Sequence, residues 1–320
     1  MISRPRFNPD RGPNQPPLKL RRSAGALAKA ERAALRILAA IVAVGTLSIH
    51  PLAQNRAFAW KATRGQGAVY LVGSVHMLTA DFYPLAASLD AAFKDSDLLV
   101  EEADLNEMLS PNTQFSMLSK GMLPAGQSID KVVSPATLAL INQHTGGVLP
   151  LEALKQFKPW FLAMTLEALE WQSAGFDASL GLDKHFFDRA QSEGKTIQAL
   201  ETTDFQISLF DGLTMDQQDR FLAETLKGVD KEKAAVAKLT GAWKTGDAAT
   251  VERLVMADVK SDPVIYDRLL VARNRTWLPK IEALVSRPRH AFVVVGAAHL
   301  VGPDGLVAML KARGYQVTQL

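Results

Sequence analysis

The sequence predicts an α/β fold, in which a central mixed or parallel sheet is built from an N-terminal and a C-terminal βαβ-like unit. Two continuous apolar runs with β-branched and aromatic residues, 68–72 and 290–295, are typical of strands buried on both faces. Each run is followed by a segment with helical spacing and then by a second strand-like run. Residues 105–286 carry mostly helical patterns, so we expect a large helical insertion between the two units.

The N-terminal unit begins at residues 60–72, which read as two short strand-like pieces around a turn at 64–67. The next segment, Pro84–Phe93, has helical spacing and a proline that suits the first turn of a helix. The run DLLVEE, Asp97–Glu102, is typical of the following strand. A strand, a helix and a strand within about thirty-five residues form a βαβ unit.

Glycines and apolar runs predict the elements that follow. Gly194 occupies a position where helices often stop in the left-handed conformation, and the short strand after it leads to Glu201. The predicted elements downstream of the N-terminal unit are a helix over 180–195, a strand over 196–200, helices between 214 and 286, a strand over 290–295, a helix over 302–315 and a strand over 316–320.

The composition limits the kind of protein that the chain can be. Its 320 residues are 48% hydrophobic and 22% charged, which is ordinary for a globular protein. Residues 1–36 hold nine Lys or Arg and two acids, 9 − 2 = +7, so the net charge of +3 leaves 3 − 7 = −4 for the rest. We therefore do not expect the domain to bind nucleic acid. The absence of cysteine excludes disulfides, thiolate zinc sites and cysteine nucleophiles.

The first fifty-five residues carry two further signals. Residues 1–36 are basic and rich in proline, with little to bury, so we expect a disordered tail. Residues 37–55 contain no charge and follow a basic flank, which indicates a signal peptide or a membrane anchor and export to the periplasm or cell envelope. The pattern does not decide between cleavage and retention, and a buried core helix is the alternative. Residues 60–320 are expected to form the α/β domain.

Two similar motifs, VYLVGSVH at 69–76 and FVVVGAAH at 292–299, place a histidine three positions after a glycine that ends a strand. In open α/β sheets ligands bind outside the carboxyl ends of the strands. Polar residues that follow predicted strands are His76, Glu102, Glu201 and His299. Imidazole and carboxylate groups on one edge suit a divalent metal ion such as manganese, cobalt or zinc, which could activate water.

Each of these residues also has a structural interpretation. A single histidine after a strand is more often a loop residue than a ligand, and Glu201 could cap the helix that follows it. Glu101 and Glu102 are adjacent in a strand, so their side chains point to opposite sides and only one is expected in the site. The H-E-x-x-H, G-x-S-x-G and phosphate-loop patterns do not occur in the sequence.

Together with their surroundings, these motifs make the chain resemble the TraB/GumN family, bacterial relatives of the Tiki proteins in a wider group with erythromycin esterase-like and ChaN-like proteins. The resemblance extends over most of residues 60–320 and includes an RN pair at Arg273 and Asn274. It implies a site that contains both G-x-x-H histidines and two glutamates. Glu102 matches a glutamate that precedes a small residue and an aspartate, here Ala103 and Asp104, and Glu201 matches the glutamate of an LET motif. Arg273 is implied to bind the substrate by orienting an acidic group or a carbonyl.

The resulting hypothesis is an exported, divalent-metal-dependent hydrolase that acts on peptide bonds. His76, Glu102 and His299 would bind the metal, and Glu201 would be a further ligand or the general base. One alternative is a non-catalytic envelope protein that binds a peptide or small molecule in the same cleft. The other is a metal-free, esterase-like hydrolase with a histidine as general base. Expected partners are a peptide or small-molecule substrate and, through residues 37–55, a membrane; the oligomeric state stays open.

Overall fold

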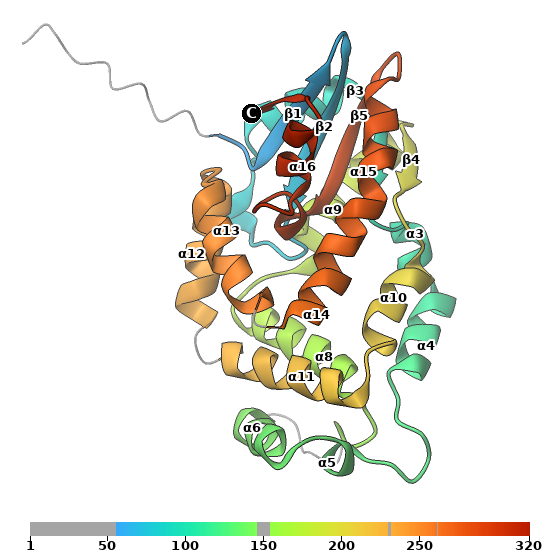
Figure 1. The fold of residues 1–320 in the computed structure, drawn as a ribbon, viewed down its shortest axis with the longest axis vertical. Helices are drawn as coiled ribbons and strands as arrows, with labels where there is room; N and C mark the ends of the chain where they lie inside the picture. Colours follow the sequence, from blue (N-terminus) through green and yellow to red (C-terminus); the bar gives the residue numbers. More distant parts are fainter. Residues whose placement is uncertain (1–55, 146–153, 230–231, 261) are drawn as a thin grey trace, which may run out of the picture. The chain divides into compact units, whose positions relative to one another are not determined.

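The structure is a computed structural model that describes residues 56–145, 154–229, 232–260 and 262–320 (Figure 1). The predicted tail over 1–36 and the signal peptide or anchor over 37–55 lie outside these residues. Among the helices that the structure does describe, none combines the length and the apolar character needed to cross a membrane. The predicted division of the chain into these three parts therefore stays a prediction.

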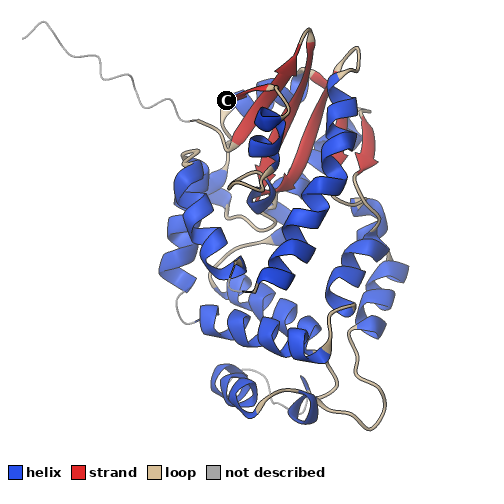
Figure 2. Ribbon diagram, in the orientation of Figure 1, coloured by secondary structure: helices blue, strands red, loops and turns tan. Residues whose placement is uncertain are grey.

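A mixed six-stranded sheet forms the centre of the domain, as predicted (Figure 2). Its order is β4-β3-β5-β2-β1-β6. The four strands from β4 to β2 are parallel to one another, whereas β1 is antiparallel to both of its neighbours. The strands are β1 Ala59–Arg64, β2 Gly67–Ser74, β3 Ser96–Glu101, β4 Thr196–Ala199, β5 His290–Gly296 and β6 Gln316–Gln319.

The helical insertion is divided in two by β4. The first part, between β3 and β4, contains α3 Leu105–Met108, α4 Pro111–Lys120, α5 Ile129–Val132, α6 Pro135–Thr145, α8 Pro159–Ser173, the 3₁₀ turn η2 Ala178–Leu180 and α9 Leu182–Ser192. The second part, between β4 and β5, contains α10 Thr203–Asp211, α11 Met215–Val229, α12 Glu232–Lys244, α13 Ala248–Val259, α14 Pro263–Tyr266, the π-helical turn η3 Asp267–Val271 and α15 Ala272–Val285.

Short helices complete the two βαβ-like units. They are η1 Ala80–Phe82 and α2 Ala87–Lys94 in the N-terminal unit, and η4 Ala297–His299 and α16 Leu306–Ala312 in the C-terminal unit. Helix α2 begins at Ala87 because Ala86 has a non-helical backbone, with ψ of 134°, so Pro84 is not in its first turn as the sequence suggested. Gly194 and Gly314 have φ of 66° and 86° and follow the ends of α9 and α16, as predicted.

Helices cover both faces of the sheet. In Figure 1, α15 and α16 lie in front of it and α9 lies behind it. Three buried aromatic rings join α2 and α9 to β5: the Phe186 ring of α9 is 5.1 Å from Phe93 of α2 and 4.6 Å from Phe292 of β5. On the α15 side, Trp277 and Ile281 are fully buried. Because both faces are covered, the strands are continuous apolar runs rather than alternating ones.

A second apolar cluster lies among the helices of the insertion. Its buried members are Ile129, Ile141, Leu154, Leu162, Ala163, Leu222 and Leu226. They come from α5, α6, α8 and α11 and from the segment just before α8. These helices therefore have a core of their own, while α9, α10 and α15 carry side chains to the edge of the sheet.

Candidate functional site

The carboxyl ends of four parallel strands meet at one edge and place the predicted residues there. Ser74 of β2 pairs with Gly296 of β5, and Glu101 of β3 pairs with Val294 and with Ala199 of β4. His76, Glu102, Glu201 and His299 follow these strand ends within three residues. The backbone N–H of Glu201 donates to the carbonyl of Glu102 at 2.9 Å. The register of the sheet thus brings both glutamates to the same place.

Arg273 lies at the centre of a buried network, with 8% of its surface exposed. Its Nε donates to Glu201 Oε1 at 3.1 Å, and its Nη2 donates to Glu201 Oε1 at 2.6 Å and Glu102 Oε2 at 2.5 Å. Its Nη1 donates to the Leu269 carbonyl at 3.0 Å and to His299 Nε2 at 2.9 Å. All five guanidinium N–H groups are therefore used within the protein. The substrate-binding role of Arg273 stays a prediction, and it would require one of these contacts to open.

His299 is buried and neutral. Arginine only donates, so Nε2 of His299 accepts from Arg273 and the ring proton lies on Nδ1, which donates to Asn274 Oδ1 at 2.6 Å. The Asn274 amide is oriented by its own donation to the Asp304 carbonyl at 2.8 Å. The indole of Trp277 lies 4.4 Å from the imidazole. Burial lowers the pKa of His299 to about 3, which agrees with the neutral ring.

The two glutamates of the network both accept hydrogen bonds from Arg273 and from one further partner or more. Glu102 Oε1 accepts from the Gly296 N–H at 2.7 Å, and its Oε2 accepts from Gln206 Nε2 at 3.1 Å as well as from Arg273. Burial alone would raise the pKa of Glu102, but the positive charge of Arg273 and the hydrogen bond from the Gly296 N–H lower it below its usual value. Glu201 Oε2 accepts from Trp277 Nε1 at 3.0 Å.

The glycines of the two G-x-x-H motifs permit close approach. A Cβ atom on Gly73 would lie 2.3 Å from the Phe58 ring, and one on Gly296 would lie 3.3 Å from Glu102 Oε1. Gly296 thus lets its own N–H reach the carboxylate, whereas Gly73 makes room for a core side chain. The repeated motif therefore serves two different purposes.

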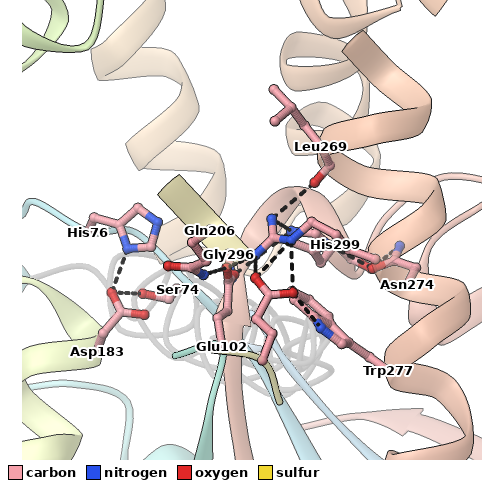
Figure 3. Close-up of polar contacts among 12 residues, drawn as sticks. Ser74, His76, Glu102, Asp183, Gln206, Leu269, Asn274, Trp277, Gly296 and His299 are labelled. Carbon is pink, nitrogen blue, oxygen red and sulfur yellow. Dashed lines mark hydrogen bonds and ion pairs between the residues drawn. The ribbon is translucent and has the colours of Figure 1, made fainter. Parts of the chain in front are cut away.

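His76 lies apart from this network and is paired with Asp183 of α9 (Figure 3). Its Nδ1 is 2.8 Å from Asp183 Oδ2, which also accepts from Ser74 Oγ at 2.5 Å. The His76 side chain is 71% exposed, and its Nε2 has no hydrogen-bond partner among the residues that the structure describes. The charge of Asp183 raises the pKa of His76 to about 9; Glu102 raises it further and Arg273 opposes it. The network is therefore close enough to act on His76.

A glycine allows Asp183 to reach His76. Gly181 precedes α9, and a Cβ atom there would lie 2.2 Å from the His76 carbonyl oxygen. The Leu182 N–H donates to the Val75 carbonyl at 3.1 Å. The first turn of α9, which contains Asp183, is thereby held against the residues that follow β2.

Glu101 and Glu102 have opposite environments, as expected for adjacent residues at a strand end. Glu101 is 3% exposed, and neither of its carboxyl oxygens has a hydrogen-bond partner among the described residues. Burial raises the pKa of Glu101 to about 9, with a further contribution from Asp183. Glu101 is therefore a neutral acid at pH 7, and Glu102 is the glutamate that joins the network.

The predicted metal ligands His76, Glu102 and His299 make contacts with other protein groups in this arrangement. In the described part of the chain, no group of three or more His, Cys, Asp or Glu could hold a metal ion. Both ring nitrogens of His299 and both carboxyl oxygens of Glu102 already make hydrogen bonds. The Arg273 guanidinium donates one of these bonds to each residue. These donors would fit a dication only after Arg273 had moved, so a role in metal binding stays a prediction.

Four residues of the site come from helices and were not predicted as functional from the sequence: Asp183, Gln206, Asn274 and Trp277. Asn274 belongs to the RN pair, and Asp183 and Gln206 lie in segments that carried the family resemblance. Trp277 is one helical turn beyond Arg273, which is the only sequence signal for it. The contacts of these residues depend on helix packing.

Comparison with known proteins identifies relatives. A model of the TraB/PrgY/gumN family matches residues 58–319 and confirms the resemblance seen in the sequence. The uncharacterized protein YbaP of Escherichia coli strain K12 is 28% identical over 251 residues, which are 77% of this chain and 89% of YbaP. YbaP of Shigella flexneri is 28% identical over 246 residues, 76% of this chain and 87% of that protein. No solved structure matches the chain.

Proposed function

The chain belongs to the TraB/PrgY/gumN family, and on this premise we propose that it is an esterase-like or amidase-like hydrolase in which His76 is the general base. The observation that carries the proposal is the hydrogen bond between His76 Nδ1 and Asp183, which leaves Nε2 without a hydrogen-bond partner among the described residues on a side chain that is 71% exposed. A histidine held by a carboxylate in this way is oriented for proton transfer.

The chemical step is the transfer of an acyl group to water. The water oxygen forms a bond to the carbonyl carbon of the substrate and gives a proton to His76 Nε2, while the carbonyl electron pair moves to its oxygen. When the intermediate collapses, the bond to the leaving alcohol or amine breaks, and the leaving group takes the proton from Nε2. Asp183 holds Nδ1–H throughout and stabilises the imidazolium that forms.

The buried network supports this step electrostatically. Glu102 and Glu201 carry one negative charge each, Arg273 carries one positive charge and His299 is neutral, so the network has a net charge of −1. Within it, the charge of Glu102 stabilises the protonated form of His76, and the charge of Arg273 opposes this effect. The contacts of Arg273 also hold three strand ends in one geometry, because its partners follow β3, β4 and β5.

A divalent-metal-dependent peptidase is the second candidate. It is favoured by the gathering of two histidines and two glutamates at one sheet edge, with a net negative charge in the network. The metal would be held by His76, Glu102 and His299 and would supply activation of water, provided that Arg273 left its present position. For either candidate, the basic flank and the uncharged run over 37–55 support export to the periplasm or envelope.

The test compares wild-type protein with His76→Ala on p-nitrophenyl esters and aminoacyl p-nitroanilides, with EDTA and with added manganese, cobalt or zinc. The matched control is His290→Ala, because His290 forms the same kind of pair with Asp95, 2.7 Å apart, at the other end of the sheet. We expect activity that resists EDTA, is lost in His76→Ala and is retained in His290→Ala. Activity that EDTA removes and a metal restores would favour the peptidase, and wild-type turnover by His76→Ala would refute the general base.

Asp183→Asn provides an independent check of the histidine pair. Because the Asp183 charge raises the pKa of His76, the wild-type rate should rise with pH as His76 loses its proton, towards pH 9. The variant should have a lower maximal rate and should reach half of it at a lower pH. If the protein binds a peptide or small molecule but neither the wild type nor any variant hydrolyses it, the result would instead indicate a non-catalytic binding protein.

A further inference from the structure

We propose that Gln206 is a catalytic residue whose side-chain carbonyl holds the attacking water against His76. This inference rests on the proposed hydrolase and identifies the second acceptor that the water needs. Gln206 belongs to α10, and its Nε2 donates to Glu102 Oε2 at 3.1 Å. Figure 3 shows its carboxamide between Glu102 and His76.

The orientation of the Gln206 amide follows from its partner. An ionised carboxylate accepts hydrogen bonds and cannot donate them, so the nitrogen of the amide faces Glu102 and the oxygen faces away. Glu102 is itself held from two other directions, by the Gly296 N–H and by Arg273. Oε1 of Gln206 has no hydrogen-bond partner among the described residues, and the side chain is only partly buried. The protein thus orients a polar oxygen and leaves it available to a ligand.

Helix α10 is fastened at several points, which makes the position of Gln206 well defined. Thr202 caps the helix by accepting from the Phe205 N–H at 3.2 Å. Thr203 Oγ1 donates to Glu107 Oε2 at 3.0 Å, which ties α10 to α3. Ion pairs tie α10 to α4 and to the residue that caps α8: Lys120–Asp204 at 2.8 Å and Lys158–Asp211 at 2.6 Å.

The chemistry of the step requires a second acceptor. A water molecule that attacks a carbonyl carbon must point a lone pair at it, so its two O–H bonds are best directed at two acceptors. His76 Nε2 accepts the proton that is transferred, and Gln206 Oε1 accepts the other one. A neutral amide is suited to this role because it orients the water without adding a further negative charge next to Glu102. When the C–O bond has formed, the proton bound to Gln206 stays on the new carboxyl oxygen.

The experiment measures kcat, KM and the pH profile for p-nitrophenyl acetate with full-length wild type, His76→Ala, Gln206→Ala and Gln191→Ala. Gln191 is the matched control, because its Nε2 also donates to a side-chain oxygen, Asn106 Oδ1 at 3.1 Å, but away from the site. We expect Gln206→Ala to lower kcat about tenfold to a hundredfold, as for loss of one hydrogen bond in the transition state. KM and the midpoint of the pH profile should stay close to the wild-type values, because the lost contact acts in the transition state.

Each other outcome overturns the inference in a recognisable way. If His76→Ala is inactive while Gln206→Ala keeps the wild-type kcat, the water-holding role of Gln206 fails and the hydrolase proposal stands. A change in KM alone would assign Gln206 to substrate binding. A shifted pH midpoint would mean that the substitution acts by moving Glu102, whose charge affects His76. If the wild type does not hydrolyse the ester, or His76→Ala hydrolyses it equally well, the hydrolase proposal and this inference fail together.

Discussion

Replacing Glu101 with Gln should change how the stability of the protein depends on pH. Glu101 is 3% exposed and has no hydrogen-bond partner for either oxygen among the described residues. Burial raises its pKa from 4.5 to about 9, and the charges of Asp183, Asp104 and Asp188 add to the effect. The folded protein therefore keeps a proton on this carboxyl at pH values where the unfolded chain has lost it.

The size of the effect follows from proton linkage. Between pH 4.5 and about 9 the folded state binds one more proton than the unfolded state at this position, so stability falls as pH rises. The slope is about 1.4 kcal/mol per pH unit, which amounts to about 4 kcal/mol between pH 5 and pH 8. Gln cannot ionise, so the Glu101→Gln variant should lack this component. The variant should gain about 4 kcal/mol relative to the wild type over the same interval, by the same relation.

Guanidinium chloride unfolding at pH 5, 6.5 and 8 measures this difference directly. Comparing the two proteins at each pH cancels the contributions of all other groups that the substitution leaves unchanged. Glu224→Gln, which alters an exposed glutamate with 51% of its side chain accessible, reports the effect of removing a carboxyl at the surface. The reasoning is refuted if the stabilities of wild type and Glu101→Gln change in parallel with pH, because Glu101 would then be ionised in the folded protein.

Two further substitutions test the buried network and the first G-x-x-H motif. Arg273→Lys should destabilise the protein by about 3–5 kcal/mol in denaturant unfolding, because a lysine cannot satisfy two buried carboxylates and His299 at once. The control is Arg275→Lys, at a position where 66% of the side chain is exposed, and it should change stability by less than about 0.5 kcal/mol. Equal effects of the two variants would contradict the central role of Arg273. Gly73→Ala should lower the melting temperature, since its Cβ would lie 2.3 Å from an aromatic ring and such overpacking costs about 1–3 kcal/mol. Gly241→Ala, within α12, should instead stabilise the protein by up to about 1 kcal/mol, because the new Cβ would have no neighbour within 4 Å beyond its own helix backbone. A loss of stability in both variants would show that crowding is not the cause at Gly73.

Local patterns in the sequence were sufficient to predict the sheet and the edge where the site lies. Strands buried on both faces must be apolar along their whole length, so β2 and β5 were recognisable from single runs. The carboxyl ends of parallel strands meet at one edge, so residues after them are expected to converge. This placed Glu102, Glu201 and His299 in one region, and in the structure Arg273 joins all three.

The use of each side chain was decided by the tertiary structure. Partners such as Asp183 and Gln206 come from helices whose positions depend on long-range packing, and a strand pattern contains no information about them. The same packing places Arg273 so that it donates hydrogen bonds to His299 and Glu102, two of the residues expected to bind a metal. It also leaves His76 in a separate pair with Asp183. The sequence by itself determined which residues reach the sheet edge, because strand periodicity is a local property. Which atoms remain free for chemistry depends on every hydrogen bond around them, and only the folded chain settles those bonds.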